Sequence, residues 1–221
     1  MLAGPIAVIG GTGKLGTAIA RRLAKAGLEV IIGSRSADSA AKTAAEVGFG
    51  LIGLTNTDAA TAASTVIVTV PFAAQEATLA EIAPHVAGKI VVDTTVPLVP
   101  PKVMRVQLPP EGSAAQRAQK LLGPGVTVVS AFHNVAAHKL VTDQRIDCDV
   151  LVFGDDKDAR AKVVELVELT GLRGVHGGAL ANSAAAEAMT SVLIFINKTY
   201  QVDGAGLFVT GPLGGPDRRA L

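Results

Sequence analysis

The chain has 221 residues, which is enough for one full α/β domain with a smaller appendage. Its formal net charge of +1 gives no electrostatic basis for binding nucleic acid or an anionic membrane surface, so we expect neither partner. Hydrophobic residues make up 49% of the chain and aromatic residues 3%, and the single Cys148 excludes an internal disulfide framework.

The first motif follows an apolar strand expected at residues 6–9. It reads Gly11-Thr12-Gly13-Lys14-Leu15-Gly16, and a helix expected at residues 14–26 follows. This is G-x-G-x-x-G between a strand and a helix, the context in which the motif indicates dinucleotide binding. The first glycine allows a tight turn, the second lets a pyrophosphate approach, and the third lets helix and strand pack closely. Backbone N–H groups and the helix dipole would hold the phosphates.

The residues after the second strand, which is expected at residues 29–32, distinguish NAD from NADP as the cofactor. NAD sites usually carry a carboxylate after this strand, whereas an Arg there accommodates the 2′-phosphate of NADP. The chain has Ser34 and Arg35 instead of a carboxylate. A guanidinium is suited to phosphate, so the sequence predicts NADP(H). The alternative is that Arg35 is a solvated residue at a strand end.

Strands and helices alternate through most of the remaining chain, which favours a right-handed parallel sheet. The expected strands are 51–54, 66–70, 89–94, 126–130, 149–154 and 173–176. The expected helices are 37–47, one from 56, 73–83, 113–122, 156–169 and 179–202. A proline-rich loop at residues 96–112 leaves the carboxyl end of a strand, where open α/β sheets bind ligands.

We therefore predict a Rossmann-type α/β fold, a doubly wound parallel sheet with a small, mainly helical carboxy-terminal domain. Residues 1–130 would form the NADP-binding domain. Residues 131–221 would form the second domain, with a flexible tail from about residue 211. The long apolar helix would pack against the sheet domain or a twin subunit.

Two further segments could carry chemistry. His133 and Asn134 follow the strand that ends near residue 130 and could donate to a ligand over the nicotinamide; alternatively, they cap the next helix. Asn182 and Ser183 open the long helix and could hold a second ligand, or form a simple N-cap. The four histidines and the one cysteine show no metal-ligand spacing, so no metal is expected.

An acid–base pair is not evident from the sequence, and this favours hydride transfer between two cofactors. Such transfer requires mainly that donor and acceptor carbons are held face to face. A conventional alcohol dehydrogenase would also need a general acid–base residue, for which His133 is the candidate. No catalytic residue is therefore assigned with certainty.

These segments together resemble the NADP-dependent coenzyme F420 (deazaflavin) oxidoreductase family. The similarity runs in order from about residue 5 to 209. Its stretches are Gly10-Gly11-Thr12-Gly13-Lys14-Leu15-Gly16, Gly33-Ser34-Arg35, Val70-Pro71-Phe72, Val96-Pro97-Leu98, Ser130-Ala131-Phe132-His133, Asp147-Cys148-Asp149-Val150, Gly154-Asp155-Asp156 and Leu180-Ala181-Asn182-Ser183. The resemblance implies a Rossmann domain, a small carboxy-terminal domain, a homodimer through the carboxy-terminal helices, and reversible hydride transfer between NADPH and F420.

The resemblance also implies roles for residues at matching positions. Thr12 to Leu15 would hold the pyrophosphate, and Ser34 with Arg35 the 2′-phosphate. Val70, Pro71 and Phe72 would line the path from adenosine to nicotinamide. Val96, Pro97 and the turn His133-Asn134-Val135-Ala136 would flank the nicotinamide and the deazaflavin. The chain departs from the family pattern in three places: residues 36–41 contain no basic residue, Phe72 replaces a common Trp, and the 99–112 loop is long.

Two other functions fit the same residues. One is an NADPH-dependent reductase of a flavin, a ferric chelate or an imine, because one fold serves many reactions. The other is a non-catalytic NADP(H)-sensing protein. A basic segment does not precede the first strand, and no uninterrupted apolar run approaches the roughly 18 residues that span a bilayer, so we expect a cytoplasmic protein.

Overall fold

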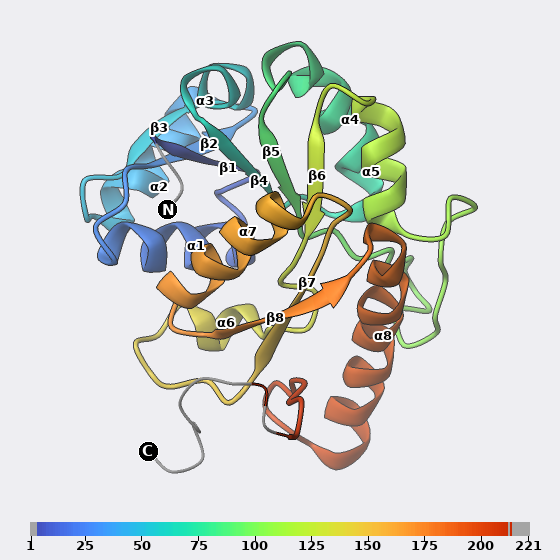
Figure 1. The fold of residues 1–221 in the computed structure, drawn as a ribbon. Coiled ribbons are helices and arrows are strands. Elements are labelled where there is room, and N and C mark those ends of the chain that lie inside the picture. The colour runs from blue at the N-terminus through green and yellow to red at the C-terminus, as the bar shows by residue number, and fades with distance from the viewer. Residues whose placement is uncertain (1–3, 212, 214–221) are drawn as a thin grey trace.

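The computed structural model describes residues 4–211 and 213, and its centre is one eight-stranded sheet (Figure 1). The strands are β1 (Ile6–Ile9), β2 (Val30–Ser34), β3 (Ile52–Thr55), β4 (Thr65–Val68), β5 (Ile90–Asp93), β6 (Thr127–Ser130), β7 (Asp149–Phe153) and β8 (Arg173–Gly178). Their order is β3-β2-β1-β4-β5-β6-β7-β8, and its first six strands follow the order typical of dinucleotide-binding folds. All neighbours are parallel except β6 and β7.

Most of the helices connect parallel strands as crossovers. The helices are α1 (Lys14–Lys25), α2 (Ala37–Val47), α3 (Asn56–Ala62), α4 (Phe72–Ile82), α5 (Ala114–Leu122), α6 (Ala137–Leu140), α7 (Lys157–Leu169) and α8 (Ser183–Tyr200). Helix α6 lies between the antiparallel strands β6 and β7, and α8 follows the last strand. Two 3-10 turns, η1 (Ala83–His85) and η2 (Leu180–Asn182), complete the set. Polar side chains cap several helices at their first turns; Ser36, Thr55, Ser113 and Asp156 each accept a hydrogen bond from a backbone N–H.

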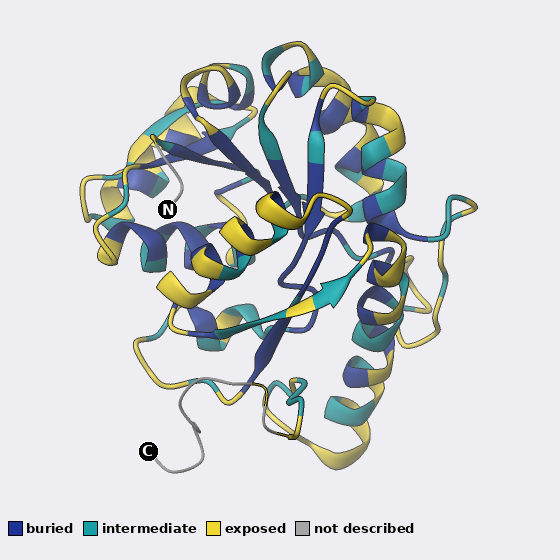
Figure 2. Cartoon of the chain, in the orientation of Figure 1, coloured by how far each residue is buried: buried dark blue, intermediate teal, exposed yellow. Residues whose placement is uncertain are grey.

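Helices cover both faces of the sheet, and each face has its own apolar core. Ile19 and Leu23 of α1 belong to one core together with Val163 of α7. Leu79 of α4 and Ala118 of α5 belong to the other. The central strands are buried on both sides, whereas the outer surfaces of the helices are exposed (Figure 2). The predicted doubly wound α/β fold is therefore confirmed.

The carboxy-terminal half adds two strands to the same sheet. β7 meets β6 antiparallel through one residue pair, Ser130 and Phe153, and β8 continues parallel to β7. The predicted strands at 149–154 and 173–176 are confirmed, with β8 extending to Gly178. The short helix α6 was not predicted. The sheet continues past residue 130, and a domain division there stays a prediction. Of the predicted tail from residue 211, residues 212 and 214–221 lie outside the described part of the chain.

One helical segment, Leu180–Tyr200, is long and apolar enough to cross a membrane by length and composition alone, although only 33% of its apolar window is buried. Two observations place its inner side against the protein. Ser183, Glu187 and Leu193 are buried, and Glu187 accepts hydrogen bonds from α5. The opposite side is exposed at Val192 and Phe195.

Candidate functional site

The strand register brings most predicted site residues to one edge of the sheet. Ile9 pairs with Gly33 of β2 and Val68 of β4, Val68 pairs with Asp93, and Asp93 pairs with Ser130. The carboxyl ends of β2, β1, β4, β5 and β6 therefore lie side by side. The segments that follow these strands hold the glycine-rich loop and the predicted stretches at 34–35, 70–72, 96–97 and 133–136. Open parallel sheets bind ligands at this edge.

The glycine-rich loop joins β1 to the start of α1. Gly13 is the N-cap of α1 and has no side chain to accept from the first turn, and that turn contains no acidic residue. Thr12, Gly13 and Lys14 are exposed. A Cβ on Gly16 would lie 2.5 Å from Thr69 Oγ1, so close packing of α1 on the residue after β4 requires glycine there. An uncapped, exposed helix start beside a lysine fits the pyrophosphate of a dinucleotide.

The end of β2 lies next to this loop, because the N–H of Gly11 donates to the carbonyl of Gly33 over 3.0 Å. Ser34 is half-buried and Arg35 is exposed. Ser36 caps α2 through its hydroxyl, which accepts from the N–H of Ser39. A free guanidinium beside a helix start is chemically suited to the 2′-phosphate of NADP. The role of Arg35 stays a prediction.

The residues after β4 and β5 are tied to the neighbouring strands. Thr69 Oγ1 donates to the carbonyl of Ile9 at 2.9 Å, and Thr94 Oγ1 donates to the carbonyl of Val68 at 3.0 Å. These bonds fix the starts of the segments that lead to Val70-Pro71-Phe72 and Val96-Pro97. Val70, Phe72 and Val96 are half-buried, Pro71 is exposed and Pro97 is buried. The segments lie at the same edge as the glycine-rich loop, as a path along a bound dinucleotide requires.

The turn after β6 is buried and strained. Phe132 is 1% exposed and has a φ of 65°, a left-handed conformation that costs a bulky residue roughly 1–2 kcal/mol. His133 Nε2 lies 2.9 Å from Ser130 Oγ, and burial lowers the pKa of His133 to about 4. The imidazole is therefore neutral near pH 7. Strain of this kind persists where the surrounding structure holds the residue in place.

The two segments predicted around a second ligand meet through α8. Asn134 Nδ2 donates to the carbonyl of Ala186 at 2.9 Å and to Thr190 Oγ1 at 3.0 Å. Thr190 Oγ1 donates in turn to the carbonyl of His133. Both amide hydrogens of Asn134 are thus engaged with α8, and this side chain orients the turn. Val135 and Ala136 are half-buried beside it.

The start of α8 is also occupied by internal contacts. Asn182 Nδ2 donates to the carbonyl of Gly177 at 3.1 Å, and its side chain does not cap the helix. Ser183 is fully buried, and its hydroxyl donates to Ser113 Oγ at 2.8 Å. The simple N-cap does not describe Asn182, whose side chain makes no cap bond and stays exposed. The roles of Asn182 and Ser183 toward a deazaflavin stay predictions.

Comparison with known proteins decides the family. Residues 5–97 match the family model described as NADP oxidoreductase, coenzyme F420-dependent. The F420-dependent NADP reductase of Methanothermobacter thermautotrophicus is 41% identical over 218 residues, covering 93% of this chain and 94% of the relative. The reductase of the same name from Methanocaldococcus jannaschii is 39% identical over 220 residues, covering 93% and 97%. The chain belongs to the F420-dependent NADP reductase family.

A solved structure agrees with this family assignment. A protein of Arthrobacter sp. FB24, provisionally assigned as an F420-dependent NADP reductase, has a TM-score of 0.84 and 26% identity. The match covers 95% of this chain and 100% of that chain. The likeness therefore extends beyond the dinucleotide-binding half to β7, β8 and α8.

Sequence reasoning missed a buried acidic cluster in this family member. Glu187 accepts from the N–H groups of Ala114 and Ala115, at 2.6 and 3.1 Å, and so caps α5 from α8. Burial raises the pKa of Glu187 to about 7 and that of Asp93 to about 6. Gln75 Nε2 donates to Asp93 and to the carbonyl of Ala114. The available signal was Glu187 itself, the one charged residue between positions 184 and 197.

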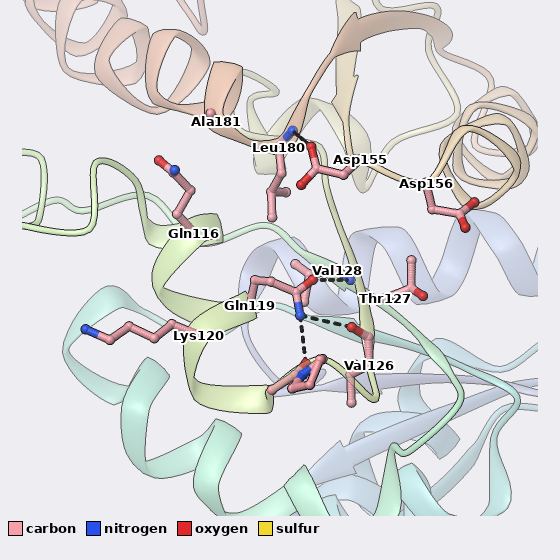
Figure 3. Close-up of a pocket in the computed structure, with 12 residues that line it drawn as sticks. Gln116, Gln119, Lys120, Val126, Thr127, Val128, Asp155, Asp156, Leu180 and Ala181 are labelled. Atoms are coloured by element: carbon pink, nitrogen blue, oxygen red, sulfur yellow. Dashed lines mark hydrogen bonds between the residues drawn. The ribbon is translucent and has the colours of Figure 1, made fainter.

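Two cavities lie beside α5, and neither contains the glycine-rich loop. One, of about 690 Å³, is lined by Gln116, Gln119, Lys120, Gly123, Pro124, Val126, Thr127, Val128, Asp155, Asp156, Leu180 and Ala181 (Figure 3). Two of its polar side chains already have partners within the protein. Gln119 forms hydrogen bonds with three backbone groups, and Asp155 accepts a hydrogen bond from the N–H of Leu180. The other, of about 550 Å³, lies under the proline-rich loop and reaches Phe72.

The described ranges 4–211 and 213 contain no group of three or more His, Cys, Asp or Glu side chains that could hold a metal ion. Burial keeps His133 neutral near pH 7, and Asp93 and Glu187 accept hydrogen bonds from within the protein. What this arrangement can do is bind, orient and exclude water.

Proposed function

We propose that the protein transfers a hydride reversibly between NADP(H) and coenzyme F420. The observation that carries the proposal is the common edge at the ends of five strands. There the uncapped start of α1, the Ser34–Arg35 pair and the turn at 133–136 follow neighbouring strands. Membership in a family whose members are named F420-dependent NADP reductases supports the identity of both cofactors.

Hydride transfer between two cofactors requires the side chains mainly to bind and orient them. A nicotinamide and a deazaflavin carry the hydride between them, and the protein holds the two rings at van der Waals distance. Thr12 to Leu15 would bind the pyrophosphate, and Ser34 with Arg35 the 2′-phosphate. Val96, Pro97 and Ala136 would line the nicotinamide. His133, Asn134, Val135, Asn182 and Ser183 would shape the deazaflavin pocket, with His133 as a neutral positioning group.

The two halves of the chain would divide this work. Residues 1–130 would bind NADP(H), whereas residues 131–221 would complete the deazaflavin pocket and a dimer contact. The outer side of α8 supports the dimer, because it exposes Val192, Phe195 and Tyr200 along one helix. The lone cysteine and the bonds of Glu187 to α5 support a cytoplasmic protein in which α8 packs on protein.

Anaerobic mixing of the protein with NADPH and oxidised F420 tests the function. We expect rapid loss of the visible absorbance of the deazaflavin, and much slower loss with NADH. Oxidised FMN, a ferric chelate and a cyclic imine serve as alternative acceptors in parallel reactions. Faster turnover of any of these would assign another acceptor, and tight NADPH binding without turnover of any acceptor would favour the NADP(H)-sensing protein.

A further inference from the structure

We infer that Arg22 is a positioning residue for hydride transfer, fixing the 133–136 turn relative to the dinucleotide loop; this inference rests on the proposed function. Arg22 lies in the last turn of α1, and its guanidinium donates to four backbone carbonyls. Nε donates to Leu140 at 2.7 Å and Nη1 to Thr170 at 2.7 Å. Nη2 donates to Thr142 at 2.6 Å and to Gln144 at 3.1 Å.

Two of these carbonyls end helices. Leu140 is the last residue of α6, and Thr170 is the C-cap of α7. Carbonyls at helix ends lack intrahelical partners and carry partial negative charge, so a half-buried cation satisfies both. Lysine could not replace this contact, because its ammonium has three donors on one atom and cannot reach carbonyls on two helices and a loop.

The same helix therefore touches both sides of the proposed reaction. The first turn of α1 follows the glycine-rich loop, and its last turn holds the segment 140–144. Arg22 lies eight residues after Lys14, the first residue of α1, so these contacts are roughly 12 Å apart on one helix. Helix α6 begins at Ala137, directly after the 133–136 turn, so a shift at Leu140 is transmitted to that turn.

The turn has a second anchor on its other side. Thr190 and the carbonyl of Ala186 on α8 hold His133 and Asn134. With α8 at one end and Arg22 at the other, the turn is fixed at both ends. Loss of the Arg22 contacts leaves one anchor. The turn then remains attached to α8, but its distance from the dinucleotide loop is no longer set by α1.

Arg21 provides a matched control on the same helix. Its guanidinium donates to Asp143 at 2.7 Å, and Lys25 also binds Asp143. Asp143 is 53% exposed, and exposed ion pairs of this type contribute little. Arg21→Lys therefore makes the same guanidinium-to-ammonium change one residue away, at a side chain that binds a carboxylate and not a helix end. It should leave hydride transfer within about twofold of the wild type.

The test compares Arg22→Lys with Arg21→Lys and the wild type in single-turnover reactions. The rate of hydride transfer from NADPH to F420 is measured per NADPH-binding site, with NADPH fluorescence giving the dissociation constant. Nicotinamide deuterated at C4 gives the isotope effect. For Arg22→Lys we expect an NADPH dissociation constant within about twofold, hydride transfer slower by roughly 10- to 100-fold, and a larger isotope effect on turnover.

Hydrogen exchange gives a readout independent of activity. Backbone amides of residues 137–144 should exchange faster in Arg22→Lys than in Arg21→Lys, while those of α1 stay protected. An unchanged transfer rate per NADPH site would overturn the inference, even with faster exchange or lower stability, because Arg22 would then be merely structural. A wild type that reduces no F420 would overturn the proposed function together with this inference.

Discussion

The two sides of the proposed site are built on opposite principles. On the proposed dinucleotide side, backbone N–H groups at the glycines would bind the ligand, and Thr12, Gly13 and Lys14 are exposed. On the acceptor side, His133 and Asn134 are buried, and Asn134 is bonded to α8. The first surface depends on glycines, which have no side chain to cover the backbone N–H groups. The second is prepared by side chains that bind one another and so hold a shape.

The largest effect is expected from adding a side chain to Gly16, where α1 packs closely on Thr69 and the glycine-rich loop. A Cβ on Gly16 would lie 2.5 Å from Thr69 Oγ1 and 2.8 Å from Gly11 Cα, so Gly16→Ala should lower the free energy of unfolding by roughly 1–3 kcal/mol. Urea denaturation measures this. Gly13→Ala is the contrasting variant, because its Cβ meets only Gly10 O at 3.3 Å. It should keep the stability and lose NADPH binding; a stable Gly13→Ala that binds NADPH normally would contradict the backbone site.

Arg35 tests the one side-chain contact assigned to the dinucleotide side. Arg35→Ala should weaken NADPH binding roughly 10- to 100-fold, the range for loss of a charge-assisted hydrogen bond, and should leave NADH binding nearly unchanged. Isothermal titration with both cofactors measures the difference. Lys42→Ala, an exposed cation of α2 paired with Glu46, is the control. Equal weakening of both cofactors would remove the 2′-phosphate role.

Glu187 tests whether buried charge shapes the acceptor side. Its pKa is raised to about 7 in the folded protein, above the ordinary value of 4.5, so the folded state binds more protons between these pH values. Stability should therefore fall as pH rises from 4.5 to 7, by at most about 1.4 kcal/mol per pH unit. Glu187→Gln should flatten this part of the curve in urea denaturation. Asp93, whose pKa is raised to about 6, acts in the same direction and remains in the variant.

The smallest effect is expected from His133. Since burial lowers the pKa of His133 to about 4, its imidazole stays neutral and does not titrate between pH 6 and 8. His133→Ala should reduce turnover several-fold by loosening the turn, without changing the ionisations in the pH–rate profile. Rate measurements at saturating NADPH across this range decide the matter. Disappearance of one ionisation would make His133 an acid–base group.

The contrast between the two sides also explains what sequence could reveal. The glycine-rich loop is local: three glycines at fixed spacing between a strand and a helix indicate its conformation and its ligand class. The buried apolar strands and most helices were likewise readable from local pattern. Helix α6 has four residues, too few for a periodicity to identify. The left-handed turn at Phe132 carries no sequence signal, because bulky residues rarely adopt it.

The acceptor side depends on long-range contacts. Arg22 meets partners 118 to 148 residues away, and Asn134 meets Ala186 across 52 residues. In the sequence, Arg22 is an ordinary basic residue in a helix. Its four partners are backbone carbonyls, so the residue types at those positions do not reveal the contact. Such contacts exist only once the sheet has brought α1, α6 and α7 together. Local reasoning therefore located the turn at 133–136 but not what holds it.

The position of Cys148 gives the protein an internal reporter. This thiol is the chain's single cysteine and is 6% exposed, and a Cβ on Gly206 would lie 2.7 Å from its sulfur. The segment over it is bonded to Asp149, through the carbonyl of Leu207 and the N–H of Val209. A thiol reagent can therefore react only when this segment lifts. The rate of labelling of Cys148 then reports how often this segment opens, and no engineered cysteine is needed. A change in the labelling rate on adding cofactor would show how ligand binding alters this opening.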